Sequence, residues 1–274
     1  MTPEESIALI KANLAEVRYC TPRSSTMLSS KRSGYYESTG VLPQLENLPI
    51  AKIGQLVQAG CHIKILLADV HAYMDSMKAP SELIAHRSEY YKFLIKSMLH
   101  VIVVDIDTAK LEFVRGSSYQ WDKDYTMDSR RLEAMTKLST ARKAGAQALD
   151  EQYLNVDAQL GGIDQRKIFT FALENLPKLG YKKRAHLMNA MVPGLEEAQK
   201  LSSSEPSSKI GLLDTPEEVS KKLKKAMCVP KKVEGNGVIA FIEHIVFLVF
   251  AVKSGTPTFA VGQRDGDFWF TKTF

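Results

Sequence analysis

The chain has 274 residues, of which 45% are hydrophobic and 24% charged. This composition is that of an ordinary globular protein and excludes disorder throughout the chain. The formal net charge of +5 is compatible with a polyanionic partner but is too small to require one. Cys20, Cys61 and Cys228 are widely spaced and form no CxxC pair, so the sequence favours a reducing compartment and suggests neither a disulfide framework nor a zinc site.

No segment of the sequence has the form expected of a signal peptide or a membrane span. The N-terminus carries acidic residues early and lacks the continuous apolar stretch of a secretory signal. The longest apolar run, VIAFIEHIVFLVFAVK, contains Glu243 and His244, which leave too few uninterrupted apolar residues to cross a bilayer. We therefore expect a cytoplasmic protein with no membrane contact.

Helical and strand patterns begin close to the N-terminus. Thr2-Pro3-Glu4-Glu5 has the form of a capping box with proline at the first helical position, which predicts a helix. Residues 20–48 show no period and predict a poorly packed or disordered segment. A helix over Ile53 to Ala59, a buried strand in HIKILLADV and a helix from about Ser81 follow.

Further along the chain, strands and helices alternate. VIVVDI and KLEFVRG predict strands, and the polar stretch from Asp122 to Tyr153 predicts one long helix. A strand over 157–163 runs into Gly161-Gly162, and DQRKIFTFALENLPKLG predicts an amphipathic helix that closes at Gly180. This order predicts an α/β fold with a parallel, doubly wound sheet. The glycine pair suits either a ligand site at the end of a strand or an ordinary tight turn.

The stretch EEAQKLSSSEPSSKIGLLD, residues 196–214, has by composition alone the character of a solvated linker. After it, Thr215-Pro216-Glu217-Glu218 repeats the capping-box pattern. The helix that it opens carries Lys221, Lys222, Lys224 and Lys225. Such a run is usually a solvated face, and contact with a phosphate backbone is the alternative.

Read together, three segments resemble the catalytic domain of the tyrosyl-tRNA synthetases of eukaryotes and archaea: QALDEQYLNVDAQLGGIDQRKIF, LGYKKRAHLMNAMVPGL and KLSSSEPSSKIGLLD. LLADVHAYMDSMKAP, GSSYQ and KDYTMD extend the resemblance, which covers roughly residues 50–247. The tryptophanyl enzymes are similar in fold, but QALDEQYL with GGIDQRK favours tyrosine. The resemblance implies an incomplete Rossmann-like class I synthetase fold with a helical C-terminal part. It implies ATP and L-tyrosine as substrates, Mg²⁺ with the ATP, tRNA(Tyr) as acceptor and, in the family, a homodimer.

The resemblance also assigns roles to residues of the amino-acid site. Asp150 would accept the phenol proton of tyrosine, and Gln147 and Gln165 would hold its amino and carboxylate end. His71 and Gln120 would line the same pocket. Taken singly, Asp150 and Gln147 could be exposed helix polars and His71 a buried, hydrogen-bonded imidazole, so the matching motifs carry these assignments.

The nucleotide site follows from the same motifs. Asp164 would accept the ribose hydroxyls of ATP, and Gly161 and Gly162 would let the nucleotide approach the backbone. Lys200 followed by Ser202, Ser203 and Ser204 corresponds to the mobile KMSSS loop, with Leu201 in place of methionine. The lysine would offer a point charge to the phosphates, and no protein side chain is expected to hold a metal.

The sequence departs from the family pattern at three places. SGYYESTGVLPQLENLP lacks a histidine where the family has its HIGH-type motif, and Pro43 stands at that position. Between Ala146 and Gln147 the family has a block with dimer contacts and a pocket tyrosine, whose position is taken by Lys143. Beyond AFIEHIVF the family continues into an anticodon-binding domain. We expect impaired activity, weakened tRNA recognition and a doubtful dimer, with a catalytically inactive remnant that binds a partner or RNA as the alternative.

The resemblance divides the chain into four parts. They are an N-terminal helix with a poorly matching segment (1–49), a Rossmann-like core with an internal deletion near residue 146 (50–195), the signature loop and following helices (196–247), and a truncated tail (248–274).

Overall fold

The structure, a computed structural model, describes most of the chain from Ser25 onward. The described residues are 25–29, 47–76, 80–103, 107–189, 194–195, 210, 214–227, 233, 235–256, 258–263 and 266–271. The predicted N-terminal helix, Pro43 and the signature loop at 200–204 lie outside these ranges.

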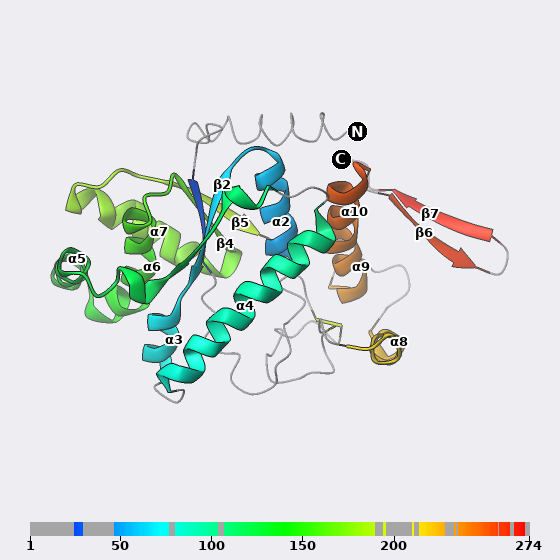
Figure 1. The fold of residues 1–274 in the computed structure, drawn as a ribbon, viewed down its shortest axis with the longest axis horizontal. Coiled ribbons are helices and arrows are strands. Elements are labelled where there is room, and N and C mark those ends of the chain that lie inside the picture. Colours follow the sequence, from blue (N-terminus) through cyan, green and yellow to red (C-terminus); the bar gives the residue numbers. More distant parts are fainter. Residues whose placement is uncertain are drawn as a thin grey trace.

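A five-stranded sheet with the order β3-β2-β1-β4-β5 forms the centre of the fold (Figure 1). Every neighbouring pair of strands is parallel. This arrangement confirms the predicted doubly wound α/β sheet. The strands are β1 (Ser25–Ser29), β2 (His62–Leu67), β3 (Leu111–Arg115), β4 (Ala158–Gly162) and β5 (Ala185–Asn189).

Strand β1 corrects the expectation that residues 20–48 are poorly packed. Ser25–Ser29 pairs with β2 on one side and with β4 on the other, at the middle of the sheet. A central strand of a parallel sheet usually shows a run of β-branched residues, and STMLS does not. The pairing with two neighbours, rather than local propensity, accounts for this strand.

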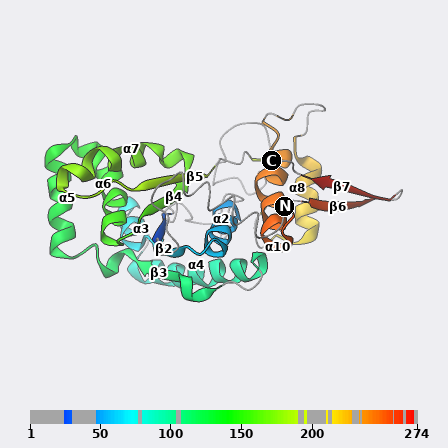
Figure 2. The ribbon, with the colours of Figure 1, turned by 90° about the horizontal axis from the view of Figure 1, so that it is seen from above.

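Helices cover both faces of the sheet (Figures 1 and 2). On one face, α2 and α4 pack with the apolar side chains of β2 into a core that includes Ile53, Ile63 and Leu99, each at most 1% exposed. On the other face, α5, α6 and α7 form a second core around Leu132, Leu149 and Phe171. The helices are α2 (Asn47–Gln58), α3 (Asp69–Ser76), α4 (Ser81–Ile102), α5 (Lys123–Met135), α6 (Leu138–Tyr153) and α7 (Arg166–Asn175). Short 3₁₀ helices lie at η3 (Thr108–Lys110), η4 (Gly116–Ser118), η5 (Ile163–Gln165) and η6 (Leu176–Leu179).

Two predicted elements differ from the structure. The first residues of VIVVDI, 101–102, are the end of α4 rather than a strand, because the helix continues until Val103 turns extended and packs into the core. The single helix expected over 122–153 is two helices. Thr136 is extended, at φ −135° and ψ 170°, and its hydroxyl donates to the Leu132 carbonyl at 2.7 Å, which ends α5.

The C-terminal part is helical and ends in a hairpin. The capping box that opens α8 (Pro216–Lys225) is formed as predicted, with the Thr215 amide donating to Glu218 at 2.8 Å. Lys222 lies 2.6 Å from Asp214 and is only 15% exposed, so this lysine is paired. Strands β6 (Thr258–Gln263) and β7 (Gly266–Thr271) form an antiparallel hairpin that extends away from the body of the molecule (Figure 1).

Glu243 and His244 do not interrupt the apolar helix near the C-terminus. They fall in a π-helical turn, η8 (Ile242–Val246), that joins α9 (Gly237–Phe241) to α10 (Phe247–Ser254). In length and composition alone, the helical segment 237–254 suffices to span a membrane, which corrects the count made from the sequence. Val249 and Val252 pack against the core beside α2.

Candidate active site

Asp150 on α6 is the centre of a buried cluster of hydrogen bonds. The residue is 4% exposed, and its Oδ1 accepts from the Tyr119 hydroxyl at 2.8 Å, from Gln120 Nε2 at 2.7 Å and from the Tyr125 hydroxyl at 3.0 Å. No described residue donates a hydrogen bond to Oδ2. The second carboxylate oxygen therefore retains its capacity to accept a hydrogen bond from a ligand hydroxyl.

The electrostatics of this cluster are set by burial without a neighbouring positive charge. Burial raises the pKa of Asp150 to about 6, and the hydrogen bonds from Gln120, Tyr119 and Tyr125 offset only part of this effect. Burial and the negative charge of Asp150 also raise the pKa of the Tyr119 and Tyr125 hydroxyls. Both phenols thus remain proton donors, and the Asp150 carboxylate accepts hydrogen bonds from these two phenolic hydroxyls.

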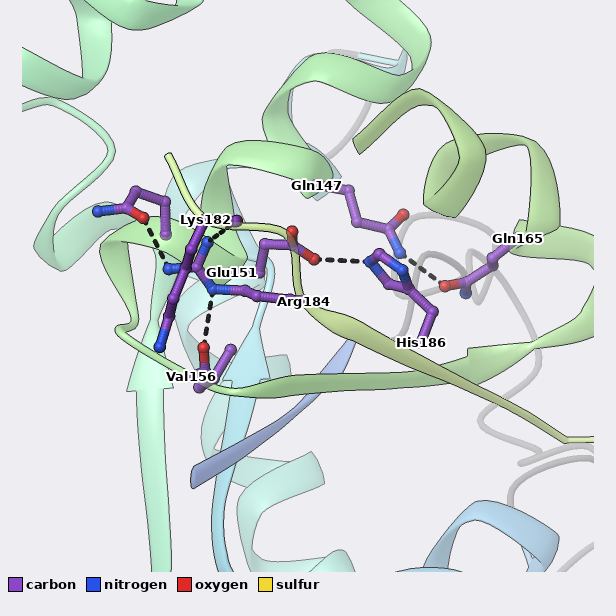
Figure 3. Close-up of polar contacts among 8 residues, drawn as sticks. Gln147, Glu151, Val156, Gln165, Lys182, Arg184 and His186 are labelled. Carbon is purple, nitrogen blue, oxygen red and sulfur yellow. Dashed lines mark hydrogen bonds and ion pairs between the residues drawn. The ribbon is translucent and has the colours of Figure 1, made fainter. Parts of the chain in front are cut away.

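A second polar contact lies one turn away on the same helix. Gln147 Nε2 donates to Gln165 Oε1 at 2.6 Å, and the two residues are 5% and 6% exposed (Figure 3). Gln147 Oε1 is buried without a hydrogen-bond partner among the described residues. An unpartnered acceptor at this depth is costly, so a ligand donor would be stabilising here.

The glycine pair at the end of β4 makes room for neighbouring side chains. A Cβ on Gly161 would lie 2.5 Å from Gln165 Oε1 and 2.8 Å from the Phe169 ring. A Cβ on Gly162 would lie 2.2 Å from Asp164 Oδ1. The absence of side chains therefore lets Gln165 lie over the strand and so reach Gln147.

These residues gather where neighbouring parallel strands end. Gln120 follows β3, Gln165 follows β4, and half-buried His71 lies on α3 just after β2. Asp69, at the start of α3 after β2, links this segment to the one that follows β3. It accepts hydrogen bonds from the Ser117 amide at 2.9 Å and from the Ser117 hydroxyl at 2.5 Å. The carboxyl edge of an open parallel sheet is the usual place for a ligand site in this kind of fold.

The structure brings some of the predicted residues together and leaves others apart. Gln120 contacts Asp150 and Gln147 contacts Gln165, whereas Asp164 is exposed at the end of β4. Lys200, Ser202, Ser203 and Ser204 lie outside the described residues. Within the described ranges, no group of three or more His, Cys, Asp and Glu side chains could hold a metal ion.

Sequence reasoning assigned no role to Tyr119 and Tyr125. Both stand in the short motifs GSSYQ and KDYTMD that carried the resemblance, so the motifs contained the signal. Which carboxylate they would meet depends on the packing of α5 against α6.

The chain matches the class I tRNA synthetases (W and Y) over residues 46–146 and 145–252, and it belongs to this family. The match thus consists of two segments that meet at residues 145–146. The predicted class I fold and the resemblance to the tyrosine enzymes are confirmed.

The relatives of this chain are tyrosine enzymes. It is 47% identical over 267 residues to the cytoplasmic tyrosine--tRNA ligase of Gallus gallus, an alignment that covers 89% of this chain and 50% of the relative. It is 48% identical over 231 residues to the cytoplasmic enzyme of Saccharomyces cerevisiae, covering 77% of this chain and 58% of the relative. The chain thus spans about half the length of each of these two relatives.

A solved structure of an archaeal relative shares the fold. The tyrosyl-tRNA synthetase of Archaeoglobus fulgidus, crystallised as a complex with L-tyrosine, is 29% identical and superimposes with a TM-score of 0.81. The superposition covers 98% of this chain and 88% of that structure.

Proposed function

We propose that this chain binds L-tyrosine and ATP and has the chemistry of a tyrosine--tRNA ligase, in which tyrosine is activated as tyrosyl-adenylate and then transferred to tRNA(Tyr). The observation that carries the proposal is the buried carboxylate of Asp150, which already accepts hydrogen bonds from two phenols and has Oδ2 left over. The relatives named for tyrosine support the same substrate.

Asp150 provides the selectivity for tyrosine over phenylalanine. The substrate phenol donates its proton to Oδ2, and phenylalanine would leave this buried acceptor without a donor. Gln147 and Gln165 hold the other end of the amino acid, where the unpartnered Gln147 Oε1 accepts from the ammonium group. His71 and Gln120 line the pocket between these two ends.

ATP binds at the same sheet edge. Asp164 accepts hydrogen bonds from the ribose, Gly161 and Gly162 keep the backbone accessible to the nucleotide, and Lys200 with Ser202, Ser203 and Ser204 contacts the phosphates. The tyrosine carboxylate attacks the α-phosphorus of ATP, an oxygen–phosphorus bond forms, and pyrophosphate leaves with the electron pair. This reaction needs no enzyme nucleophile, so the protein positions the reactants and stabilises charge. Mg²⁺ enters with ATP as part of that substrate.

Activation is slow in this chain. The family match is split into two segments at residues 145–146, where the resemblance implies that a block with a pocket tyrosine and dimer contacts is missing. In addition, His62 is the first histidine of the sequence, so the segment before α2 offers none to ATP. The break at residues 145–146 also removes the block from which the family's homodimer contacts are expected. The names of the relatives support a cytoplasmic location.

Tyrosine-dependent exchange of pyrophosphate into ATP tests the proposal. We expect measurable but low exchange compared with the chicken relative, lost in Asp150→Ala and in Lys200→Ala and retained in Asp124→Ala, which removes an exposed carboxylate from α5. Exchange that survives Asp150→Ala would contradict the assignment of the site. Tyrosine binding without any exchange would instead support the catalytically inactive binding module.

A further inference from the structure

A buried carboxylate–imidazole contact lies behind the amide contact of Gln147 and Gln165. Glu151 Oε2 on α6 is 2.8 Å from His186 Nε2 on β5, and the two side chains are 1% and 5% exposed. The Phe169 ring stacks on the imidazole with a centroid distance of 4.6 Å and an interplanar angle of 17°. Burying a carboxylate is costly compared with packing an apolar side chain of similar size, so its presence here indicates a role beyond packing.

Unpartnered polar atoms gather in the same layer between α6 and the sheet. His186 Nδ1, Gln147 Oε1 and both amide atoms of Gln159 are buried without a hydrogen-bond partner in the part of the chain that the structure describes. Gln159 is 0% exposed and is the register partner of His186 across β4 and β5. Native folds leave few such atoms, and a cluster of them indicates a place for ordered water or for polar groups of a ligand.

This layer is continuous with the amide contact. Gln147 and Glu151 are four residues apart on α6 and therefore share a helix face. Phe169, which stacks on His186, also lies against the position above Gly161 that Gln165 occupies. In Figure 3 the imidazole lies between the Glu151 carboxylate and the two glutamine amides.

We propose that Glu151 and His186 are positioning residues for the ammonium end of the amino-acid substrate, acting through the side chains of Gln159 and Gln147. The inference rests on the proposed function. An ionised Glu151 can only accept, so His186 donates from Nε2 and keeps Nδ1 as an acceptor. Through a bridging water, that acceptor orients the Gln159 amide nitrogen towards it, which leaves Gln159 Oε1 and Gln147 Oε1 as acceptors for N–H donors. The buried carboxylate of Glu151, which also interacts electrostatically with Arg184, favours a cation at the same place.

A purely structural pair would behave differently. Arg184, two residues before His186, already ties the start of β5 to its surroundings by donating to the Val156 carbonyl at 2.7 Å and to Gln152 Oε1 at 2.6 Å (Figure 3). If Glu151 and His186 only helped Arg184 to hold the start of β5, their loss would lower stability and weaken the binding of every ligand equally.

Binding of three related ligands separates the two roles. The ligands are L-tyrosine, tyramine, which lacks the carboxylate, and 3-(4-hydroxyphenyl)propionate, which lacks the ammonium group. Glu151→Gln removes the charge, and His186→Gln keeps a donor for Glu151 but removes the Nδ1 acceptor. We expect both variants to bind tyrosine and tyramine about tenfold more weakly, because the acceptors for the ammonium group are no longer held in place, and to bind the propionate as the wild type does.

Asp128→Asn is the matched control, because it neutralises another buried carboxylate, 3% exposed, outside the site. We expect it to leave the relative affinities of the three ligands unchanged. Equal losses for all three ligands in Glu151→Gln and His186→Gln would overturn the inference while leaving the proposed function intact. A wild-type chain that binds none of the ligands would reject the proposed function and this inference with it.

A measurement on the wild-type chain covers the case in which the variants do not fold. Nitrogen-15 NMR of the His186 ring reports which nitrogen carries the proton. We expect protonated Nε2 and unprotonated Nδ1; a proton on Nδ1 in the free protein would overturn the inference.

Discussion

Two buried carboxylates on neighbouring helices accept hydrogen bonds from the same kind of donor, but only one has a cation beside it. Asp128 on α5 accepts from the hydroxyls of Tyr153 and Tyr181, and Arg131 lies 3.1 Å from its other oxygen. Asp150 on α6 accepts from two other tyrosines and from Gln120, all of them neutral.

The difference indicates which carboxylate the fold uses for its own stability. At Asp128 both oxygens have protein partners, one of them a positive charge, so the group is satisfied within the fold. At Asp150 three neutral donors converge on one oxygen, and burial leaves the pKa of the carboxyl raised to about 6. A buried charge without compensation lowers stability. The buried Asp150 carboxylate therefore fits a group that serves a ligand. Substitution of Asp150 should mainly change ligand binding, whereas substitution of Asp128 should mainly change the stability of the fold.

The largest effect is expected for Asp150→Asn on tyrosine binding. The amide can still accept from Tyr119 and Tyr125, but its nitrogen replaces Oδ2 and cannot accept the substrate phenol. We expect the affinity for tyrosine to fall about a hundredfold, or ~3 kcal/mol. Calorimetric titration measures it, and an affinity within threefold of the wild type would show that Asp150 does not bind the phenol.

The stability of the chain should depend on pH through Asp150. Its pKa in the folded chain, about 6, lies above the ordinary value of 3.8, so the folded state holds this proton more tightly than the unfolded state does. The free energy of unfolding should therefore fall as the pH rises from about 4 to 6, by up to about 3 kcal/mol. Asp150→Asn has no titrating carboxyl at this position and therefore serves as the reference. Urea denaturation at about pH 4 and about pH 6 measures the free energy of unfolding of both chains. The value for the wild type should fall relative to that of Asp150→Asn as the pH rises, and an unchanged difference between the two chains would contradict the raised pKa of Asp150.

A smaller loss of stability is expected for Asp128→Ala. The substitution removes the acceptor of two tyrosine hydroxyls and the partner of Arg131, whose side chain is 61% exposed and can turn to water. We expect the free energy of unfolding to fall by about 2 kcal/mol at neutral pH, with the tyrosine affinity of the folded chain unchanged. Parallel denaturation and binding measurements check both parts, and a loss of affinity without a loss of stability would reverse the assignment of the two carboxylates.

The sequence predicts those elements of the fold whose signals are local. The capping box at Thr215, the helix from Ser81 and the stop at Gly180, which adopts φ +88°, are each determined by residues within a few positions. Strand β1 was missed, because its five residues carry no strand pattern and are held by β2 and β4. The break at Thr136 was missed because the polar helical pattern continues on both sides of it.

The site divides in a similar way. Gln120, Gln147, Asp150 and Gln165 could be selected by resemblance, but which of them touch depends on contacts between α6, η5 and the residues after β3. The Glu151 and His186 contact joins residues 35 positions apart. No local spacing indicates such a pair, since it exists only once α6 lies over β5.

The smallest effects are expected from removing single hydroxyls beside the two carboxylates. Tyr125 and Tyr153 lie edge to face with ring centroids 4.9 Å apart, and each donates to a different aspartate. Tyr125→Phe and Tyr153→Phe should each lower the free energy of unfolding by about 1 kcal/mol, because each removes one hydrogen bond and keeps the ring packing. Only Tyr125→Phe should raise the pKa of Asp150 further, since that hydroxyl stabilises its ionised form. Carbon-13 NMR of the Asp150 carboxyl follows this titration, and an equal shift in both variants would mean that the rings couple the two clusters.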